Sequence, residues 1–158
     1  MSMRLYLVQH AEAVSEEISQ NRPLTEQGKQ QAKKMAAFLK AAQVEVYTLL
    51  SSPKLRATET AKIFSILLRE GGLMQQRQNL KPNDPVVDML NEMEFEEEDI
   101  MVVGHLPFLQ KLAGLALTGK EESTAVSFKP AGVVCLERTS PGLWQLQFAL
   151  SPELLKFK

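Results

Sequence analysis

The chain has very few of the residues on which disulfide and metal chemistry depend. It contains one cysteine and two histidines among 158 residues. A single cysteine cannot form a disulfide within the chain, which suits a reducing compartment, and we expect a cytoplasmic protein. Cys135 lies among apolar residues and is predicted to be a small core residue on a strand. Two histidines without clustered cysteines supply few donors, so a metal site is the weaker alternative.

An excess of charge and long apolar runs are also missing. Eighteen basic and nineteen acidic side chains leave a net charge of -1, so anion binding has to be local, and we expect no nucleic acid as a partner. No apolar run has the length of a membrane span, and the run after Met1 is too short for a signal peptide; we therefore expect no membrane partner. Length and an ordinary 44% hydrophobic content predict one globular domain over residues 1–158.

Both histidines follow apolar runs that are typical of interior strands. Residues 4–8 read Arg-Leu-Tyr-Leu-Val and lead into Gln9 and His10, and residues 100–104 lead into His105. In open α/β sheets, ligands bind at the carboxyl ends of the strands. The two histidines are therefore candidates for one shared site.

The remaining periodicity predicts strands that alternate with helices. Helices are expected over residues 26–42 with Thr25 as N-cap, from Ser52 as N-cap and Pro53 to Gly71 and Gly72, over 86–93, and after Pro107. Further strands are expected over residues 44–50, 74–79, 126–129, 132–137 and 143–150. This order predicts an α/β fold, a mixed sheet covered by helices on both faces.

Four side chains near these strand ends have the chemistry of a phosphate pocket. They are His10, Arg22, Arg56 and His105. The first turn of a helix has unpaired amides that attract anions, and an arginine adds a planar fork that matches phosphate oxygens. A neutral imidazole can attack phosphorus and carry the phosphoryl group. Taken singly, each histidine has the simpler interpretation of a structural residue and each arginine that of a surface residue, so the prediction depends on their convergence.

Four motifs in order resemble the histidine phosphatase superfamily. They are Val8-Gln9-His10-Ala11, Arg22-Pro23-Leu24-Thr25 with Gly28, Ser52-Pro53-Lys54-Leu55-Arg56-Ala57 with Thr60, and Val103-Gly104-His105-Leu106-Pro107. Within the superfamily, the chain is most similar to the small bacterial phosphohistidine phosphatases of the SixA type. The resemblance implies a three-layer α/β/α sandwich of the phosphoglycerate-mutase type, with a mixed, mostly parallel sheet and with no metal or organic cofactor.

The resemblance also implies a role for each residue. His10 would be the nucleophile, Arg22 and Arg56 would hold the phosphoryl oxygens, and His105 would donate a hydrogen bond to the transferring group. Larger members carry insertions that cap the pocket, and this chain has no room for them. The expected substrate is therefore a phosphohistidine on a signalling or phosphotransfer protein, and the expected product is inorganic phosphate.

Gln9 departs from the family pattern, which has arginine before the nucleophile. Its amide can still donate a hydrogen bond to phosphate, but a neutral bond contributes about 1 kcal/mol, against roughly 1.5–3 for a charged one. At ~1.4 kcal/mol per tenfold, the change predicts weaker binding or slower turnover by one or two powers of ten. Ala11 in place of glycine matters only if that position needs a positive φ.

The general acid and the substrate stay open at this stage. Asp84 and Asp88 lie in the region where relatives place an acid, and Glu12 is close to His10 in sequence, but no pattern selects one of them. A phosphoramidate has a weak P–N bond and needs less help than an ester. Two alternatives to the phosphohistidine phosphatase remain: a catalytically weakened module that binds phosphate or phosphopeptides, and a phosphatase of small phosphorylated metabolites.

Overall fold

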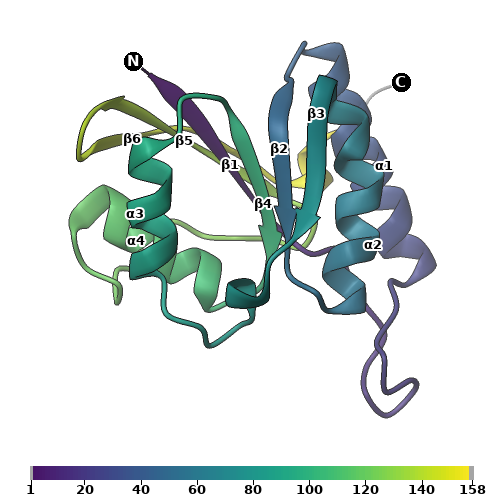
Figure 1. Ribbon diagram of the computed structural model, residues 1–158. Helices are drawn as coiled ribbons and strands as arrows, with labels where there is room; N and C mark the ends of the chain where they lie inside the picture. The colour runs from purple at the N-terminus through teal and green to yellow at the C-terminus, as the bar shows by residue number, and fades with distance from the viewer. Residues whose placement is uncertain (1, 157–158) are drawn as a thin grey trace.

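The computed structural model describes residues 2–156, which form a six-stranded sheet between two layers of helices (Figure 1). The strands are β1 (Met3–Gln9), β2 (Val46–Ser51), β3 (Leu68–Gln76), β4 (Ile100–Gly104), β5 (Val133–Ser140) and β6 (Leu143–Leu150). The α-helices are α1 (Glu26–Ala41), α2 (Leu55–Phe64), α3 (Val87–Phe95) and α4 (Phe108–Thr118). No helix among these described residues has both the length and the apolar character needed to cross a membrane.

The order of the strands places the two histidine-bearing strands side by side. The strand order is β3-β2-β4-β1-β5-β6, and the first four strands are parallel to one another. Strand β5 is antiparallel to β1, and β6 is antiparallel to β5. Gln9 at the end of β1 pairs with Gly104 at the end of β4, and Ser51 at the end of β2 pairs with Val103. The predicted three-layer sandwich with a mixed, mostly parallel sheet is confirmed.

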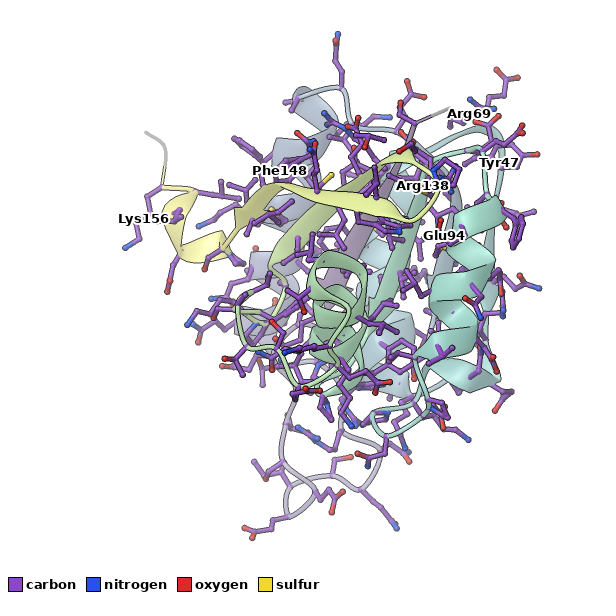
Figure 2. The ribbon with its side chains drawn as sticks, turned by 90° about the vertical axis from the view of Figure 1, so that its left-hand side faces the viewer. Tyr47, Arg69, Glu94, Arg138, Phe148 and Lys156 are labelled. Atoms are coloured by element: carbon purple, nitrogen blue, oxygen red, sulfur yellow. The ribbon has the colours of Figure 1, made fainter. Side chains whose placement is uncertain are left out.

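The β5–β6 hairpin is tied to the end of α3 by a buried arginine. Arg138 is 5% exposed and donates to the carbonyls of Met93 and Glu96, the latter at 2.7 Å. Trp144 Nε1 donates to Glu94 Oε1 at 2.6 Å, and Figure 2 shows Arg138 and Glu94 close together where the hairpin meets α3. Since the last carbonyls of a helix have no partners within it, the guanidinium completes the C-terminus of α3.

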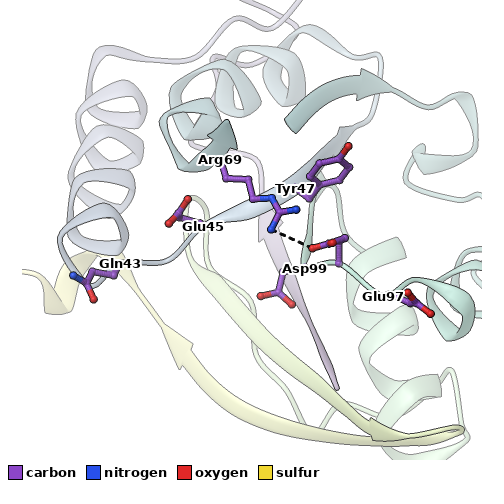
Figure 3. Close-up of a pocket in the computed structure, with 7 residues that line it drawn as sticks. Gln43, Glu45, Tyr47, Arg69, Glu97 and Asp99 are labelled. Carbon is purple, nitrogen blue, oxygen red and sulfur yellow. Dashed lines mark ion pairs between the residues drawn. The ribbon is translucent and has the colours of Figure 1, made fainter. Parts of the chain in front are cut away.

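A polar pocket lies at the amino ends of the parallel strands, far from the ends that carry the histidines (Figure 3). Arg69 forms an ion pair with Glu98 at 3.3 Å and lies 4.8 Å above the ring of Tyr47. Both partners of the ion pair are substantially exposed, so solvent screening leaves it a small contribution to stability. Arg69 is therefore an arginine that lies at the opposite end of the strands from the two histidines.

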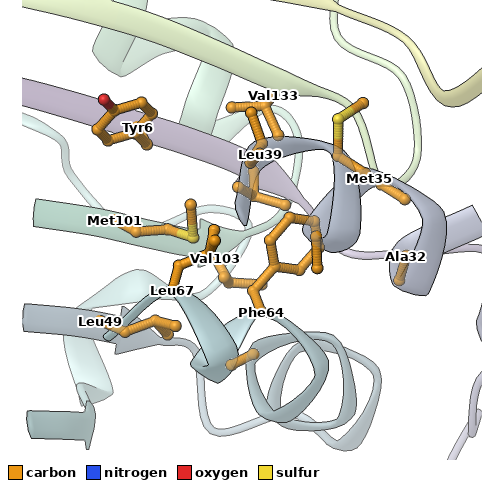
Figure 4. Close-up of a cluster of buried hydrophobic side chains, with 14 of the residues drawn as sticks. Tyr6, Ala32, Met35, Leu39, Leu49, Phe64, Leu67, Met101, Val103 and Val133 are labelled. Carbon is orange, nitrogen blue, oxygen red and sulfur yellow. The ribbon is translucent and has the colours of Figure 1, made fainter. Parts of the chain in front are cut away.

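The core is divided by the sheet into two hydrophobic clusters. Along β1, Tyr6 and Val8 pack toward α1 and α2 (Figure 4), whereas Leu5 and Leu7 pack toward α3 and α4. Residues 101 and 103 of β4 alternate with residues 100 and 102 in the same way. Burial of both faces explains why these strands read as continuous apolar runs.

Helix α1 and the parallel core strands match their predictions, and the N-cap is confirmed. Thr25 Oγ1 accepts a hydrogen bond from the Gly28 amide at 2.9 Å. A Cβ at Gly28 would lie 2.2 Å from the carbonyl oxygen of Glu12, so only glycine lets this turn approach the segment after His10.

Three of the predicted boundaries are wrong. Helix α2 begins at Leu55 rather than at Pro53, and its N-cap is Lys54 rather than Ser52. It ends at Phe64, and a 3-10 turn then leads into β3, which contains Gly71 and Gly72. This strand forms one edge of the sheet and is largely exposed, so it lacks an apolar period and its first half was missed.

The predicted strand over residues 126–129 is absent from the described residues. Val126 and Phe128 are each 8% exposed and pack over the α3–α4 side of the core from an irregular segment. Their alternation with exposed residues gives the sequence pattern of a strand although no strand forms there.

Candidate active site

The two histidines lie against each other at the carboxyl edge of the sheet. Their ring centroids are 5.1 Å apart and the rings are inclined at 59°. His10 directly follows β1 and its amide donates to the carbonyl of Gly104 at 2.9 Å, so the pairing of β1 with β4 extends into the site. The convergence expected from the sequence is therefore present.

His10 has a defined tautomer because its first ring nitrogen faces a carbonyl. Nδ1 lies 2.8 Å from the carbonyl oxygen of Ala11, which can only accept, so Nδ1 carries the proton and Nε2 has the free lone pair. Burial lowers the pKa of His10, and the charges of Arg56 and Arg22 lower it further against the opposing effect of the Ala11 carbonyl. The imidazole is thus mostly neutral at pH 7.

His105 is more deeply buried and is also neutral. It is 2% exposed, and its Nε2 lies 2.8 Å from Ser52 Oγ. Burial, followed by the neighbouring His10 and by Arg56, lowers its pKa to about 3. Its Nδ1 is buried and has no hydrogen-bond partner among the described residues.

Two arginines complete the group and come from different segments. Arg22 lies in the loop between β1 and α1 with φ 51, and its Nε donates to the carbonyl of Val14 at 2.9 Å. Arg56 lies in the first turn of α2, and its Nε is buried without a partner among residues 2–156. The charges of both arginines lower the pKa of both imidazoles, so the four predicted side chains lie within electrostatic reach of one another.

The loop that carries Arg22 is held to α2 by two hydrogen bonds. Thr60 Oγ1 accepts from the Ala11 amide at 2.9 Å and donates to the Arg56 carbonyl at 2.8 Å. Glu59 accepts from the Leu24 amide at 2.8 Å. Figure 1 shows the loop extending beyond the sheet at the edge where the parallel strands end. These bonds fix the segment after His10 before any ligand arrives.

A family model matches the part of the chain that carries three of these four residues. The model of the histidine phosphatase superfamily (branch 1) matches residues 5–81, a span that includes His10, Arg22 and Arg56. The matched span is just under half of the chain, and over it the sequence is similar to the histidine phosphatase superfamily. His105 lies beyond the matched span and joins the site through β4.

Solved structures share the fold of this chain over nearly its whole length. The protein histidine phosphatase SixA complexed with tungstate has a TM-score of 0.86 and 24% identity, and the alignment covers 98% of this chain and 100% of that one. A phosphoserine phosphatase from Entamoeba histolytica has a TM-score of 0.74 and 18% identity, with coverage of 98% and 100%. A phosphoglycerate mutase from Plasmodium falciparum has a TM-score of 0.70 and 19% identity, with coverage of 94% and 90%. A comparison with curated protein sequences found no match.

The two departures from the superfamily pattern have different consequences. Ala11 is fully buried and does not have a positive φ, so it replaces glycine without backbone strain. Gln9 ends β1, and its side-chain oxygen is buried with no partner among the described residues. The residue before His10 therefore carries a neutral, buried amide rather than a charged group.

Two of the three acid candidates are engaged in local hydrogen bonds. Glu12 accepts from the Thr25 hydroxyl at 2.7 Å, and Asp84 accepts from the Lys81 amide at 2.9 Å. Asp88 is exposed in the first turn of α3. Among residues 2–156, no hydrogen bond or ion pair joins any of the three to the histidines or to the two arginines. The identity of a general acid stays a prediction.

Sequence reasoning gave no site role to three residues that the structure places here. Ser52 contacts His105, Thr60 holds the segment after His10, and the charge of Lys54 acts on His105. All three belong to the motif around Arg56, which was the available signal. The part of the chain that is described contains no group of three or more His, Cys, Asp or Glu placed to hold a metal ion.

The two imidazoles can be titrated directly because the chain has no others. We expect His10 to gain its proton below the ordinary pKa of 6.5, since burial penalises the charged ring, and His105 to gain it at about pH 3. His105 should therefore stay neutral as the pH falls from 8 to 6.5, and His10 should be mostly neutral above pH 6.5. Nitrogen-detected NMR between pH 8 and 4 measures this, with His105→Gln for assignment, and a His105 midpoint near 6.5 would contradict the buried position.

Proposed function

We propose that this protein is a phosphatase that acts through a phosphohistidine on His10, and that its substrate is a phosphohistidine carried by a protein. The observation that carries the proposal is the pair of neutral imidazoles 5.1 Å apart beside two arginines. One imidazole has a free Nε2 lone pair, and both arginines belong to segments held by hydrogen bonds. This arrangement suits attack on a tetrahedral anion.

The reaction has two steps. His10 Nε2 attacks phosphorus, the bond from phosphorus to the leaving nitrogen or oxygen breaks, and the leaving group takes that electron pair. Arg22 and Arg56 stabilise the equatorial oxygens, and His105 donates a hydrogen bond to one of them. Water then attacks phosphorus, the P–Nε2 bond breaks and its electron pair returns to the ring, and the proton lost by the water passes to solvent; inorganic phosphate is released and the neutral imidazole is restored.

A protein-borne phosphoramidate is favoured over an ester by the surroundings of the site. Glu12 and Asp84 are bonded elsewhere, and a phosphoramidate depends less on a strong acid because its P–N bond is weak. His105 and the arginines lie at loop and helix ends at the carboxyl edge of the sheet. The similarity in fold to the protein histidine phosphatase SixA supports the same substrate class.

The substrate class is tested by comparing kcat/KM for three substrates. These are a phosphohistidine on a phosphotransfer protein, phosphoserine, and a small sugar phosphate. We expect the phosphohistidine protein to give the highest value. A higher value for either ester would favour a phosphatase of small metabolites, an alternative supported by the similarity in fold to a phosphoserine phosphatase.

Gln9 favours a second candidate, a phosphate- or phosphopeptide-binding module with weakened catalysis. In a working enzyme, Gln9→Arg should raise kcat/KM by roughly ten- to a hundredfold, because a charged hydrogen bond of about 1.5–3 kcal/mol replaces a neutral one. Gln9→Met, which removes the amide without adding charge, is the matched control and should give no gain. Turnover at background in both the wild type and Gln9→Arg, with phosphate still bound, would establish the binding module instead.

A further inference from the structure

Ser52 is held in hydrogen-bond contact with His105. It follows the last residue of β2, and its amide donates to the carbonyl of Val103 on β4 at 3.1 Å. The serine is fully buried, and its Oγ lies 2.8 Å from His105 Nε2. Because β2 and β4 pair directly, the sheet sets this contact.

The second hydrogen-bond partner of the Ser52 hydroxyl shows which group donates in the contact with His105. Ser52 Oγ also accepts from the amide of Lys54 at 3.3 Å. The hydroxyl has a single proton, and His105 Nε2 is the acceptor within its reach. If Nε2 carried the proton instead, the hydroxyl proton would be buried without an acceptor among the described residues, which is unfavourable by about 1–3 kcal/mol.

We propose that Ser52 is a positioning residue that donates to Nε2 of His105 and so keeps the proton of that ring on Nδ1. Nδ1 is buried and unpartnered beside the His10 ring, and as an N–H it offers a hydrogen bond to an anionic oxygen. The opposite tautomer would present a lone pair, which repels an anion. Ser52 therefore decides whether this ring assists or opposes the binding of a phosphoryl oxygen.

This role rests on the proposed function, since it supplies the donor that His105 contributes to the transferring group. It adds a reason why the motif begins with serine. A ring whose pKa is about 3 cannot donate as an imidazolium near neutral pH, so the neutral N–H has to face the ligand. The interpretation of Ser52 as a helix cap is replaced by one in which its hydroxyl serves the site.

The experiment reads the tautomer by ¹⁵N NMR of the two imidazoles in the intact, ligand-free protein at pH 7. The wild type should show His105 protonated on Nδ1, and inorganic phosphate should shift that signal. Ser52→Ala should move His105 toward the Nε2–H form and lower kcat on the order of ten- to a hundredfold, by analogy with outer partners of metal-bound histidines. Ser52→Thr, which keeps a hydroxyl, should restore the Nδ1–H form and part of the rate.

Ser51→Ala is the matched control. Ser51 is also buried at 2% exposure, is the preceding residue, and has no hydrogen bond to His105. It should leave the tautomer and the rate unchanged. An Nε2–H signal in the wild type, or an unchanged tautomer in Ser52→Ala, would overturn the proposal.

The spectrum separates this proposal from the proposed function because it needs no turnover. A wild type with His105 in the Nδ1–H form that hydrolyses none of the three substrates would retain the positioning role of Ser52 and reject the phosphatase. An active phosphatase with His105 in the Nε2–H form would retain the phosphatase function and reject the positioning role of Ser52.

Discussion

His10→Ala is expected to abolish labelling of the protein by a phosphoryl donor and to lower turnover by at least about a thousandfold, as loss of a catalytic nucleophile does. His10 is the imidazole with a free Nε2, whereas Nε2 of His105 is engaged with Ser52. A phosphohistidine is labile in acid and stable in base, which distinguishes it from phosphoserine. The measurement is the protein-bound phosphate that remains after each treatment.

His105→Gln is the informative comparison for this result. It removes the second ring but leaves the nucleophile, so labelling should persist while turnover falls. Equal labelling of the wild type and His10→Ala would show that the assignment of His10 as the nucleophile is wrong. Labelling that survives acid and disappears in base would point to a hydroxyl as the acceptor.

Arg56→Ala is expected to produce the largest loss of phosphate affinity. Each charge-assisted hydrogen bond contributes roughly 1.5–3 kcal/mol, so the Kd for inorganic phosphate should rise at least ten- to a hundredfold per bond lost. Arg56→Lys should recover only part of this, because an ammonium group cannot offer the planar fork. Isothermal titration with phosphate at fixed ionic strength measures the change.

Arg69→Ala is the matched control for the removal of an arginine. Arg69 lies in the pocket of Figure 3, paired with Glu98 at the opposite end of the strands, and should leave phosphate binding unchanged. Since Arg56 Nε has no protein partner among the described residues, its removal leaves no acceptor unsatisfied and should barely change the Tm. An unaltered Kd in Arg56→Ala would remove this arginine from the site.

The central strands and their histidines could be predicted because their physical signal is local. Both faces of β1 and β4 are buried, which requires uninterrupted apolar residues, and each run ends where the polar residues of the site begin. Thr25 was predictable as a cap for a similar reason, since capping is completed within three residues. The four residues of the pocket then followed from parallel topology together with the family resemblance.

The features that were missed depend on contacts between distant segments. Ser52 has the sequence context of a helix cap, and only the pairing of β2 with β4 brings His105 to its hydroxyl. Gly71 and Gly72 have the composition of a helix stop but belong to an edge strand that buries almost nothing. Phe128 alternates like a strand residue because it covers the core from an irregular segment. No local pattern distinguishes these cases.

The direct pairing of β1 with β4 has a further consequence for the distance between the two imidazoles. Adjacent strands are spaced by about 4.8 Å, and the two rings, one at the tip of each strand, are 5.1 Å apart. The separation of the two imidazoles therefore follows the spacing of the strands that carry them. Changes in the surrounding loops can alter which molecules approach, but the distance between the two rings stays set by the paired strands.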